Sequence, residues 1–342
     1  MRAETFEFLR SLLNTPTPSG FEAPGQRVWS DYARRFADEV RSDKYGNTIA
    51  VVNAGARPKI VLDGHCDEIG LMVKHIDEKG FIRFQPLGGL NAQAISSQRV
   101  VIHGRQAVHG VIVPDSRPDS REKVTPVDEA VIDTGLDRET LCQRIEVGDV
   151  VSFASELAVL NDKVYVGRNF DDRIGTYCLL AAMQRLEAAP VDVYAVSTVQ
   201  EEVGVRGART ASFAVEPDIG IALDGSLTRG PYSKDYDKLC DVGKGTGIYI
   251  MDRLTIGDRR LVRFLFDVCE QAGVPYQKNI GGGTDASAIQ KARRGSLSTT
   301  VGAPVRYMHS TVQLCHADDI EATVDLLVAF IARAHELIAQ TA

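Results

Sequence analysis

Two neighbouring glutamates, Glu201 and Glu202, closely follow an apolar run at residues 193–199 (VYAVSTV). A run that is apolar on both faces is typical of a buried parallel strand, so the pair is expected at the carboxyl end of such a strand. Adjacent carboxylates repel each other and are costly to remove from water. A pair at the edge of a core therefore needs a bound cation, a shared proton or full solvation, and the rest of the sequence favours the cation.

Four further stretches place a potential metal ligand beside a glycine or at the end of an apolar run. They are residues 63–67 (DGHCD), 170–173 (FDDR), 223–225 (LDG) and 307–310 (YMHS). Two histidines and several carboxylates form the ligand set of a pair of divalent metals. In an open α/β sheet, ligands gather at the carboxyl ends of strands, and four residues are expected there: His65, Glu201, Glu202 and Asp224. A single histidine there is more often structural, but together these residues favour divalent metals over a thiolate-bound structural zinc.

Strand and helix patterns alternate on both sides of the central part of the chain. The strands are expected at residues 60–65, 191–199, 218–224 and 296–301, and the helices at residues 172–186, 258–272 and 318–338. This alternation predicts an α/β domain with a mixed, mostly parallel sheet flanked by helices.

Between residues 70 and 164 the pattern changes to short alternating apolar runs separated by glycines, which predicts a small barrel-like β domain. Because α/β patterning lies on both sides, this domain is expected to be an insertion. The predicted organisation is a discontinuous catalytic domain at residues 1–69 and 165–342 and an inserted β domain at residues 70–164. Residues 114–128, rich in proline, serine and charge, are expected to form a mobile loop.

The composition argues against several classes of partner. The chain of 342 residues has 46 acidic and 39 basic residues, a formal charge of −7 and no long basic run, which argues against nucleic acid and anionic membranes. Its N-terminal stretch carries Glu4 and Glu7 where a signal peptide would be apolar, and no apolar run is long enough to span a membrane. The six cysteines form no CxxC pair and are expected to be reduced, mostly buried thiols. We therefore expect a cytoplasmic protein that acts on a small molecule or peptide.

Five motifs resemble, in the same order, those of the M42 family of dinuclear metallo-aminopeptidases. They are GHCDEIG at residues 64–70, FDDRIG at 170–175, VQEEVG at 199–204, LD at 223–224 and RYMHS at 306–310. The resemblance spans essentially the whole chain, including the β insertion, and implies a zinc-peptidase-like fold. Asp63 and Cys66 stand where small or apolar residues are expected, which leaves the ligands intact but changes the polarity behind His65.

The resemblance implies two metal sites that share one carboxylate. Asp171 resembles the residue that bridges both metals, Glu202 and His309 would complete one site, and His65 and Asp224 would complete the other. Each metal then has three protein ligands, which leaves positions open for water and substrate, as in a catalytic site.

The resemblance also assigns roles to two residues beside the ligands. Glu201 would be the general base that takes a proton from a metal-bridged water and returns it to the leaving amine. Asp67 would accept the second N–H of His65 and fix its tautomer. A cis peptide bond is implied between Asp171 and Asp172.

The function implied is the hydrolysis of N-terminal residues from short peptides with two divalent ions per subunit. Zn²⁺ or Co²⁺ is expected, with Mn²⁺ as an alternative. The family also implies a homo-oligomer in which dimers assemble to a dodecamer, with the β insertion serving dimerisation. Two alternatives stay open, a dinuclear deacylase of N-acyl amino acids and a non-catalytic assembly protein, although an intact Glu201 argues against the second.

Two other features have simpler interpretations. The glycine-rich stretch at residues 281–285 (GGGTD) lacks the lysine of a phosphate-binding loop and is expected to line a substrate pocket, with Thr284 or Asp285 as a helix N-cap. Cys66 is expected to point away from His65 and to be a core thiol rather than a nucleophile.

Overall fold

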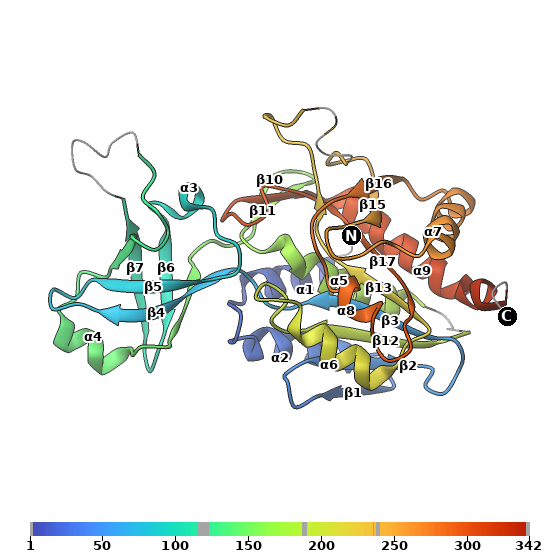
Figure 1. The fold of residues 1–342 in the computed structure, drawn as a ribbon, viewed down its shortest axis with the longest axis horizontal. Coiled ribbons are helices and arrows are strands. Elements are labelled where there is room, and N and C mark those ends of the chain that lie inside the picture. The colour runs from blue at the N-terminus through green and yellow to red at the C-terminus, as the bar shows by residue number, and fades with distance from the viewer. Residues whose placement is uncertain (1–2, 115–122, 187–189, 235, 237–239, 340–342) are drawn as a thin grey trace.

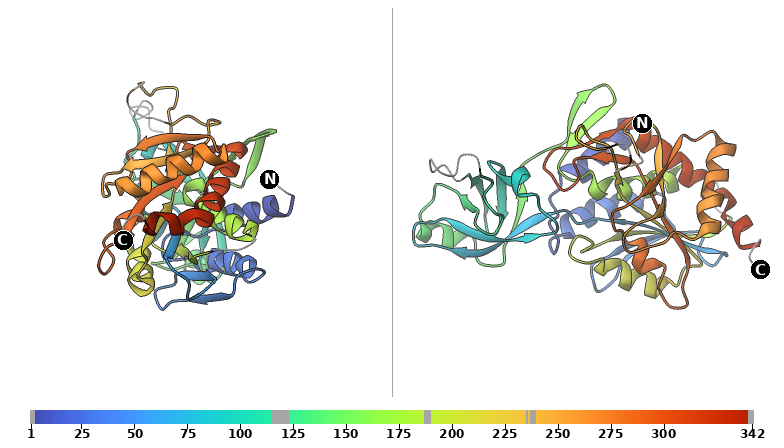
Figure 2. Two further views of the ribbon diagram at one scale, coloured as in Figure 1. Left: turned by 90° about the vertical axis from the view of Figure 1, so that its right-hand side faces the viewer. Right: turned by 45° about the horizontal axis from the view of Figure 1, so that its top comes forward.

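The computed structural model describes residues 3–114, 123–186, 190–234, 236 and 240–339. These residues form a large α/β body with a smaller β barrel that projects from one side, and the barrel stands apart from the body in Figure 1 and in the right-hand view of Figure 2. The predicted fold class is confirmed. Residues 115–122 of the predicted loop lie outside the described residues.

The α/β body is organised on an eight-stranded mixed sheet (Figure 1). Its strands, in spatial order, are β1 (Glu39–Ser42), β2 (Thr48–Val52), β12 (Asp192–Thr198), β3 (Lys59–His65), β13 (Ile219–Leu223), β17 (Leu297–Gly302), β15 (Thr246–Met251) and β16 (Tyr276–Ile280). The central strand β3 runs parallel to both neighbours, with Thr198 of β12 opposite His65 and Ala222 of β13 opposite Asp63. The carboxyl ends of these three strands therefore lie together at one edge of the sheet.

Helices cover both faces of this sheet. They are α1 (Ala3–Asn14), α2 (Ala23–Ala33), α5 (Phe170–Arg185), α6 (Arg206–Val215), α7 (Arg259–Ala272), α8 (Ala286–Ile289) and α9 (Ala317–Ala339). Side chains of β3 alternate between two cores, because successive residues of a strand point to opposite faces. Ile60 and Leu62 pack with α5 and α9, whereas Val61 packs with α6 and α8. Burial on both faces explains why β3 reads as a continuous apolar run.

The inserted barrel is closed and has its own hydrophobic core. Its strands, in order around the barrel, are β4 (Gly70–Ile76), β5 (Ile82–Leu87), β8 (Val131–Asp133), β7 (Ala107–Val113), β6 (Arg99–His103) and β9 (Val150–Phe153). Two short helices, α3 (Ala92–Ile95) and α4 (Arg138–Arg144), accompany them. The barrel closes where Leu71 of β4 pairs with Val151 of β9.

The barrel ends earlier than the predicted boundary at residue 164. After Phe153 the chain enters a second, five-stranded sheet. Its strands are β10 (Ala158–Asn161), β11 (Val164–Gly167), β19 (Gln313–His316), β18 (Pro304–Arg306) and β14 (Ser226–Leu227). Because β11 pairs with the distant strand β19, the hairpin β10–β11 belongs to the α/β body, although its sequence pattern resembles that of the barrel.

No helix among the described residues is long and apolar enough to cross a membrane. All six cysteines are free, as predicted, and five of them, Cys66 included, are buried.

Candidate metal centre

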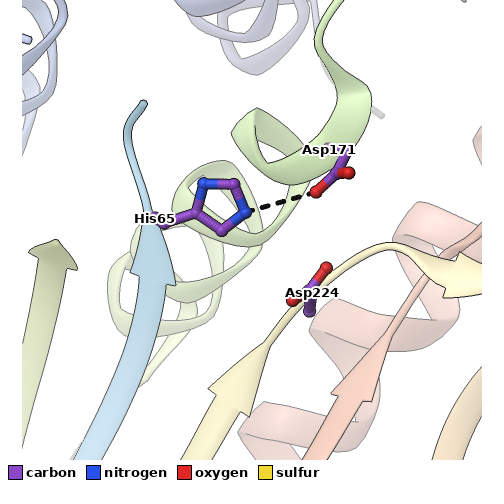
Figure 3. A group of neighbouring side chains, drawn as sticks. All are labelled: His65, Asp171 and Asp224. Carbon is purple, nitrogen blue, oxygen red and sulfur yellow. Dashed lines mark hydrogen bonds and ion pairs between the residues drawn. The ribbon is translucent and has the colours of Figure 1, made fainter. Parts of the chain in front are cut away.

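Four of the five predicted metal ligands come from segments beside the carboxyl edge of the main sheet, and the fifth comes from the five-stranded sheet. His65 is the last residue of β3, Asp171 lies at the start of α5 and Asp224 directly follows β13. Figure 3 shows that these three side chains face one another. Glu202 follows β12, and His309 lies between β18 and β19.

The structure groups these residues into two sets of three that share Asp171. His65, Asp171 and Asp224 place their ligand atoms within 4.8 Å of one another, and so do Asp171, Glu202 and His309. Oδ1 of Asp171 lies 3.2 Å from Nε2 of His65, and Oδ2 lies 3.3 Å from Nε2 of His309. One oxygen of the shared carboxylate therefore faces each set, which is the arrangement of a carboxylate that bridges two cations.

Backbone carbonyls orient both histidines. Nδ1 of His65 lies 3.1 Å from the carbonyl oxygen of Asp67, and Nδ1 of His309 lies 2.8 Å from that of Gly89. A carbonyl oxygen can only accept, so in each ring Nδ1 donates and Nε2 is left facing Asp171. Metal-binding histidines are commonly held by such a hydrogen bond on the other ring nitrogen.

The charges of the site fit divalent cations. Burial raises the pKa of Glu202 to about 8 and raises the pKa of Asp224 well above its ordinary value. A hydrogen bond to Asp171 raises the pKa of His309 to about 10, and hydrogen bonds from the two histidines lower the pKa of Asp171 although burial opposes this. These shifts indicate a cluster of buried carboxylates that favours positive charge beside it. Divalent cations would neutralise the same cluster and use the same imidazole nitrogens and carboxylate oxygens as ligands.

Asp67 organises the glutamate pair. Its carboxylate accepts the backbone N–H of Glu201 at 2.9 Å, that of Glu202 at 3.2 Å and the hydroxyl of Ser19 at 2.6 Å. Oδ1 of Asp67 also lies 3.5 Å from Nδ1 of His65, the partner expected from the sequence, although the backbone carbonyl of Asp67 is closer to that nitrogen at 3.1 Å. The side chain of Asp67 is directed mainly to the segment that carries the two glutamates.

All five predicted ligands line a cavity of about 990 Å³. Glu201 lines this cavity together with the five ligands, and burial raises the pKa of its carboxyl well above the ordinary value. Leu227, Met251 and Ile280 line the apolar part. Residues 281–284 also line the cavity, as predicted, and Asp285 is the N-cap residue of α8. The peptide bond between Asp171 and Asp172 is cis, as the resemblance implied.

A loop of the barrel contributes to the centre, which the sequence analysis missed. Gly88 and Gly89 follow β5, and both approach ligands so closely that a side chain would collide. A Cβ at residue 88 would lie 2.9 Å from Oε2 of Glu202, and a Cβ at residue 89 would lie 2.9 Å from Nδ1 of His309. The adjacent glycines were the only sequence signal of this approach.

Two buried arginines, also missed, hold the segment that follows β3. Arg173 donates from Nε to the carbonyl of Cys66 at 2.7 Å and from Nη1 to that of Leu12 at 2.6 Å. Arg168 pairs with Glu68 at 2.9 Å, and both side chains are almost fully buried. These contacts fix the backbone on either side of Asp67.

Comparisons with known proteins agree with this geometry. The profile of the M42 glutamyl aminopeptidase family matches residues 46–326. A lysyl aminopeptidase from Pyrococcus furiosus is 33% identical, covering 95% of this chain and 96% of its own. The crystal structure of a TET aminopeptidase from a marine sediment archaeon of the Thaumarchaeota has a TM-score of 0.95 at 34% identity and 99% coverage of both chains. The TET1 peptidase of Pyrococcus horikoshii, which can assemble into a tetrahedron or a large octahedral shell, has a TM-score of 0.87 at 30% identity and covers 96% of this chain and 99% of its own. The chain therefore belongs to the M42 family of aminopeptidases.

Proposed function

We propose that this protein removes N-terminal residues from short peptides with two divalent ions, and that Glu201 is its general base. The observation that carries the proposal is the position of Asp171, whose two carboxylate oxygens face two different histidines 3.2 and 3.3 Å away. Each oxygen belongs to a set of three ligand side chains, the number that catalytic sites supply while keeping positions open.

The proposed cations are Zn²⁺ or Co²⁺, with Mn²⁺ as an alternative, because the ligands are imidazoles and carboxylates without thiolates. When bound, such a pair lowers the pKa of a water molecule and polarises the carbonyl of the scissile amide. His65 and Asp224 would hold one ion, Glu202 and His309 the other, and Asp171 both.

Glu201 is proposed to move the proton. It lines the cavity next to Glu202 and is not a member of either ligand set. Burial raises the pKa of its carboxyl, and a raised pKa suits a group that takes a proton from water and returns it to the leaving amine. Asp67 would position this base through the backbone N–H of Glu201, rather than by contact with substrate.

We further propose that the protein is a homo-oligomer in which dimers assemble to a dodecamer, with the inserted barrel, from β4 to β9, providing dimer contacts. The assembly of the TET1 relative into closed shells supports this proposal. Light scattering of the native protein tests it: a monomeric mass would contradict the oligomer, and an unchanged mass after charge substitutions across the barrel would contradict the role of the insertion.

Chelation and metal replacement test the catalytic proposal. Metal-free protein should have no activity on aminoacyl p-nitroanilides, activity should return with Zn²⁺, Co²⁺ or Mn²⁺, and elemental analysis should find two ions per chain. Full activity without metal would refute the mechanism. A parallel assay with N-acetyl amino acids separates the deacylase alternative, because a free α-amine is required only by the aminopeptidase.

A further inference from the structure

A second cavity adjoins the one that contains the metal centre. Its volume is about 480 Å³, and Gly204, Val205 and Leu254 line both cavities. It lies between α6 and the segment that follows α8, on the face of the sheet opposite α5 and α9. A peptide that extends past these three shared residues would pass from the first cavity to the second.

Three cationic side chains line this second cavity, namely those of Arg209, Lys291 and Arg293, and we refer to it as the basic cavity. Arg293 is held in place, because its guanidinium lies 3.5 Å from the ring centroid of Phe213 and its Nε donates to the carbonyl of Phe213 at 2.9 Å. The remaining N–H groups of this guanidinium are left for another acceptor.

The positive charge of the basic cavity is not neutralised by the carboxylates around it. In the part of the chain that the structure describes, Arg209 and Lys291 form no ion pair. The neighbouring Glu216 pairs instead with Arg294, at 3.4 Å, and Arg294 does not line the cavity. A protein with a formal charge of −7 thus presents a local cluster of cations beside its catalytic cavity.

We propose that the basic cavity binds a carboxylate on the leaving part of the peptide substrate, with the C-terminal carboxylate as its main ligand. The inference rests on the proposed function, in which the first residue of the substrate is committed to the metal centre. Only downstream residues can then enter the basic cavity, and every unblocked peptide ends in a carboxylate. Guanidinium groups pair with carboxylates through two parallel hydrogen bonds, which suits Arg209 and Arg293 to this ligand.

Such a site makes the enzyme selective for peptide length. A peptide residue spans at most about 3.3–3.6 Å, so only peptides within a narrow range of lengths can reach the metal centre and the basic cavity together. Peptides in this range gain a charge-assisted contact that longer peptides lose. The basic cavity would thereby favour short peptides.

A panel of aminoacyl p-nitroanilides first identifies the N-terminal residue that the protein hydrolyses best. The test then compares pairs of peptides that begin with this residue, have the same length and end either in a free carboxylate or in an amide. At the optimal length the free acid should have a KM lower by about 3- to 10-fold, as expected for charge-assisted contacts at a partly exposed site. Arg209→Gln combined with Arg293→Gln should remove this preference, because both guanidinium groups that line the basic cavity are then lost. The p-nitroanilide has no carboxylate, so its hydrolysis by the wild-type protein tests the proposed function separately.

Arg294→Gln is the matched control, because it removes one charge from an adjacent position outside the basic cavity. Equal KM values for acid and amide at every length, or a preference that survives the double substitution, would overturn the inference, and so would an equal loss in the control. Amidated peptides that carry Glu or Gln downstream of the first residue test whether a side-chain carboxylate can replace the terminal one. A lower KM for the Glu peptide that is lost in the double variant would support binding of a side-chain carboxylate in the basic cavity. Absence of p-nitroanilide hydrolysis would overturn the proposed function and this inference with it.

Discussion

Replacing Gly89 by alanine should weaken one metal site and spare the other. Gly89 lies in the loop after β5 of the barrel, and its carbonyl accepts from Nδ1 of His309 at 2.8 Å. A Cβ at this position would lie 2.9 Å from Nδ1 and 3.3 Å from Cε1 of the same ring. The φ angle of Gly89 is not positive, so the backbone accepts alanine and the collision with His309 dominates. The imidazole must therefore move or the loop must retreat, and either change lengthens the hydrogen bond.

The magnitude follows from the role of that hydrogen bond. Loss of a partner that orients a ligating histidine typically weakens metal binding 10- to 100-fold, which corresponds to about 1.4–2.7 kcal/mol. The effect should fall on the set formed by Asp171, Glu202 and His309. The set that contains His65 should keep its affinity, because His65 is oriented by the carbonyl of Asp67.

Titration of metal-free protein with Zn²⁺, followed by elemental analysis at limiting metal, measures the two affinities separately. Gly167→Ala is a suitable control, because a Cβ at Gly167 would have its nearest contact at 3.6 Å, an ordinary van der Waals distance. If Gly89→Ala bound both ions like the wild-type protein, the carbonyl of Gly89 would not orient His309. If both sites weakened equally, the barrel loop would act on the whole centre rather than on one histidine.

Three further predictions concern groups in or near the core. Glu201→Gln should lower kcat roughly 10²- to 10⁴-fold with near-normal metal content, because it removes the proposed base. Glu202→Gln should instead lose one ion and be partly rescued by excess metal, because it removes a ligand. Elemental analysis and kcat of both variants check this prediction, and the opposite pattern would exchange their roles. Iodoacetamide should label the exposed Cys142 in the native protein and not Cys66, because burial shields the Cys66 thiol and raises its pKa to about 11. Mass spectrometry checks this, and labelling of Cys66 would contradict its position in the core. Burial raises the pKa of Glu22 to about 7 from 4.5, so the folded protein holds a proton that the unfolded chain releases, and stability should fall as pH rises from 4.5 through 7. Glu22→Gln should remove this loss, up to roughly 3 kcal/mol at pH 8, and an unchanged Tm difference between pH 5 and pH 8 would show that Glu22 does not cause it.

The sequence predicted most of the α/β body because its signals are local. Strands β3 and β12 are buried on both faces, so each appears as a continuous apolar run. Parallel strands of this kind bring their carboxyl ends to one edge, and that rule alone brought His65 and Asp224 together. The hydrophobic pattern cannot show which of several acidic residues binds a metal. The role of Asp171 was therefore predicted only from the resemblance to the M42 family.

The features that the sequence did not predict depend on contacts between distant segments. Nothing in the pattern of residues 154–167 distinguishes a barrel hairpin from the hairpin β10–β11, because only the pairing of β11 with β19 decides between them. The direction of the Asp67 carboxylate was equally hidden, since the backbone N–H groups that it accepts lie more than 130 residues away in the chain.

The two ligand sets also differ in how far they depend on contacts between distant segments. The set that contains His65 and Asp224 stands on neighbouring strands of the central sheet, where a register fixed by strand pairing and burial determines each position. The other set takes His309 from a connection in the five-stranded sheet and has this ring oriented by Gly89 of the barrel. His309 is also 41% exposed, whereas His65 is 2% exposed. The first set therefore depends mainly on the central sheet, whereas the second also depends on how the barrel and the five-stranded sheet are placed against it. A change in the barrel is therefore expected to act on the second set.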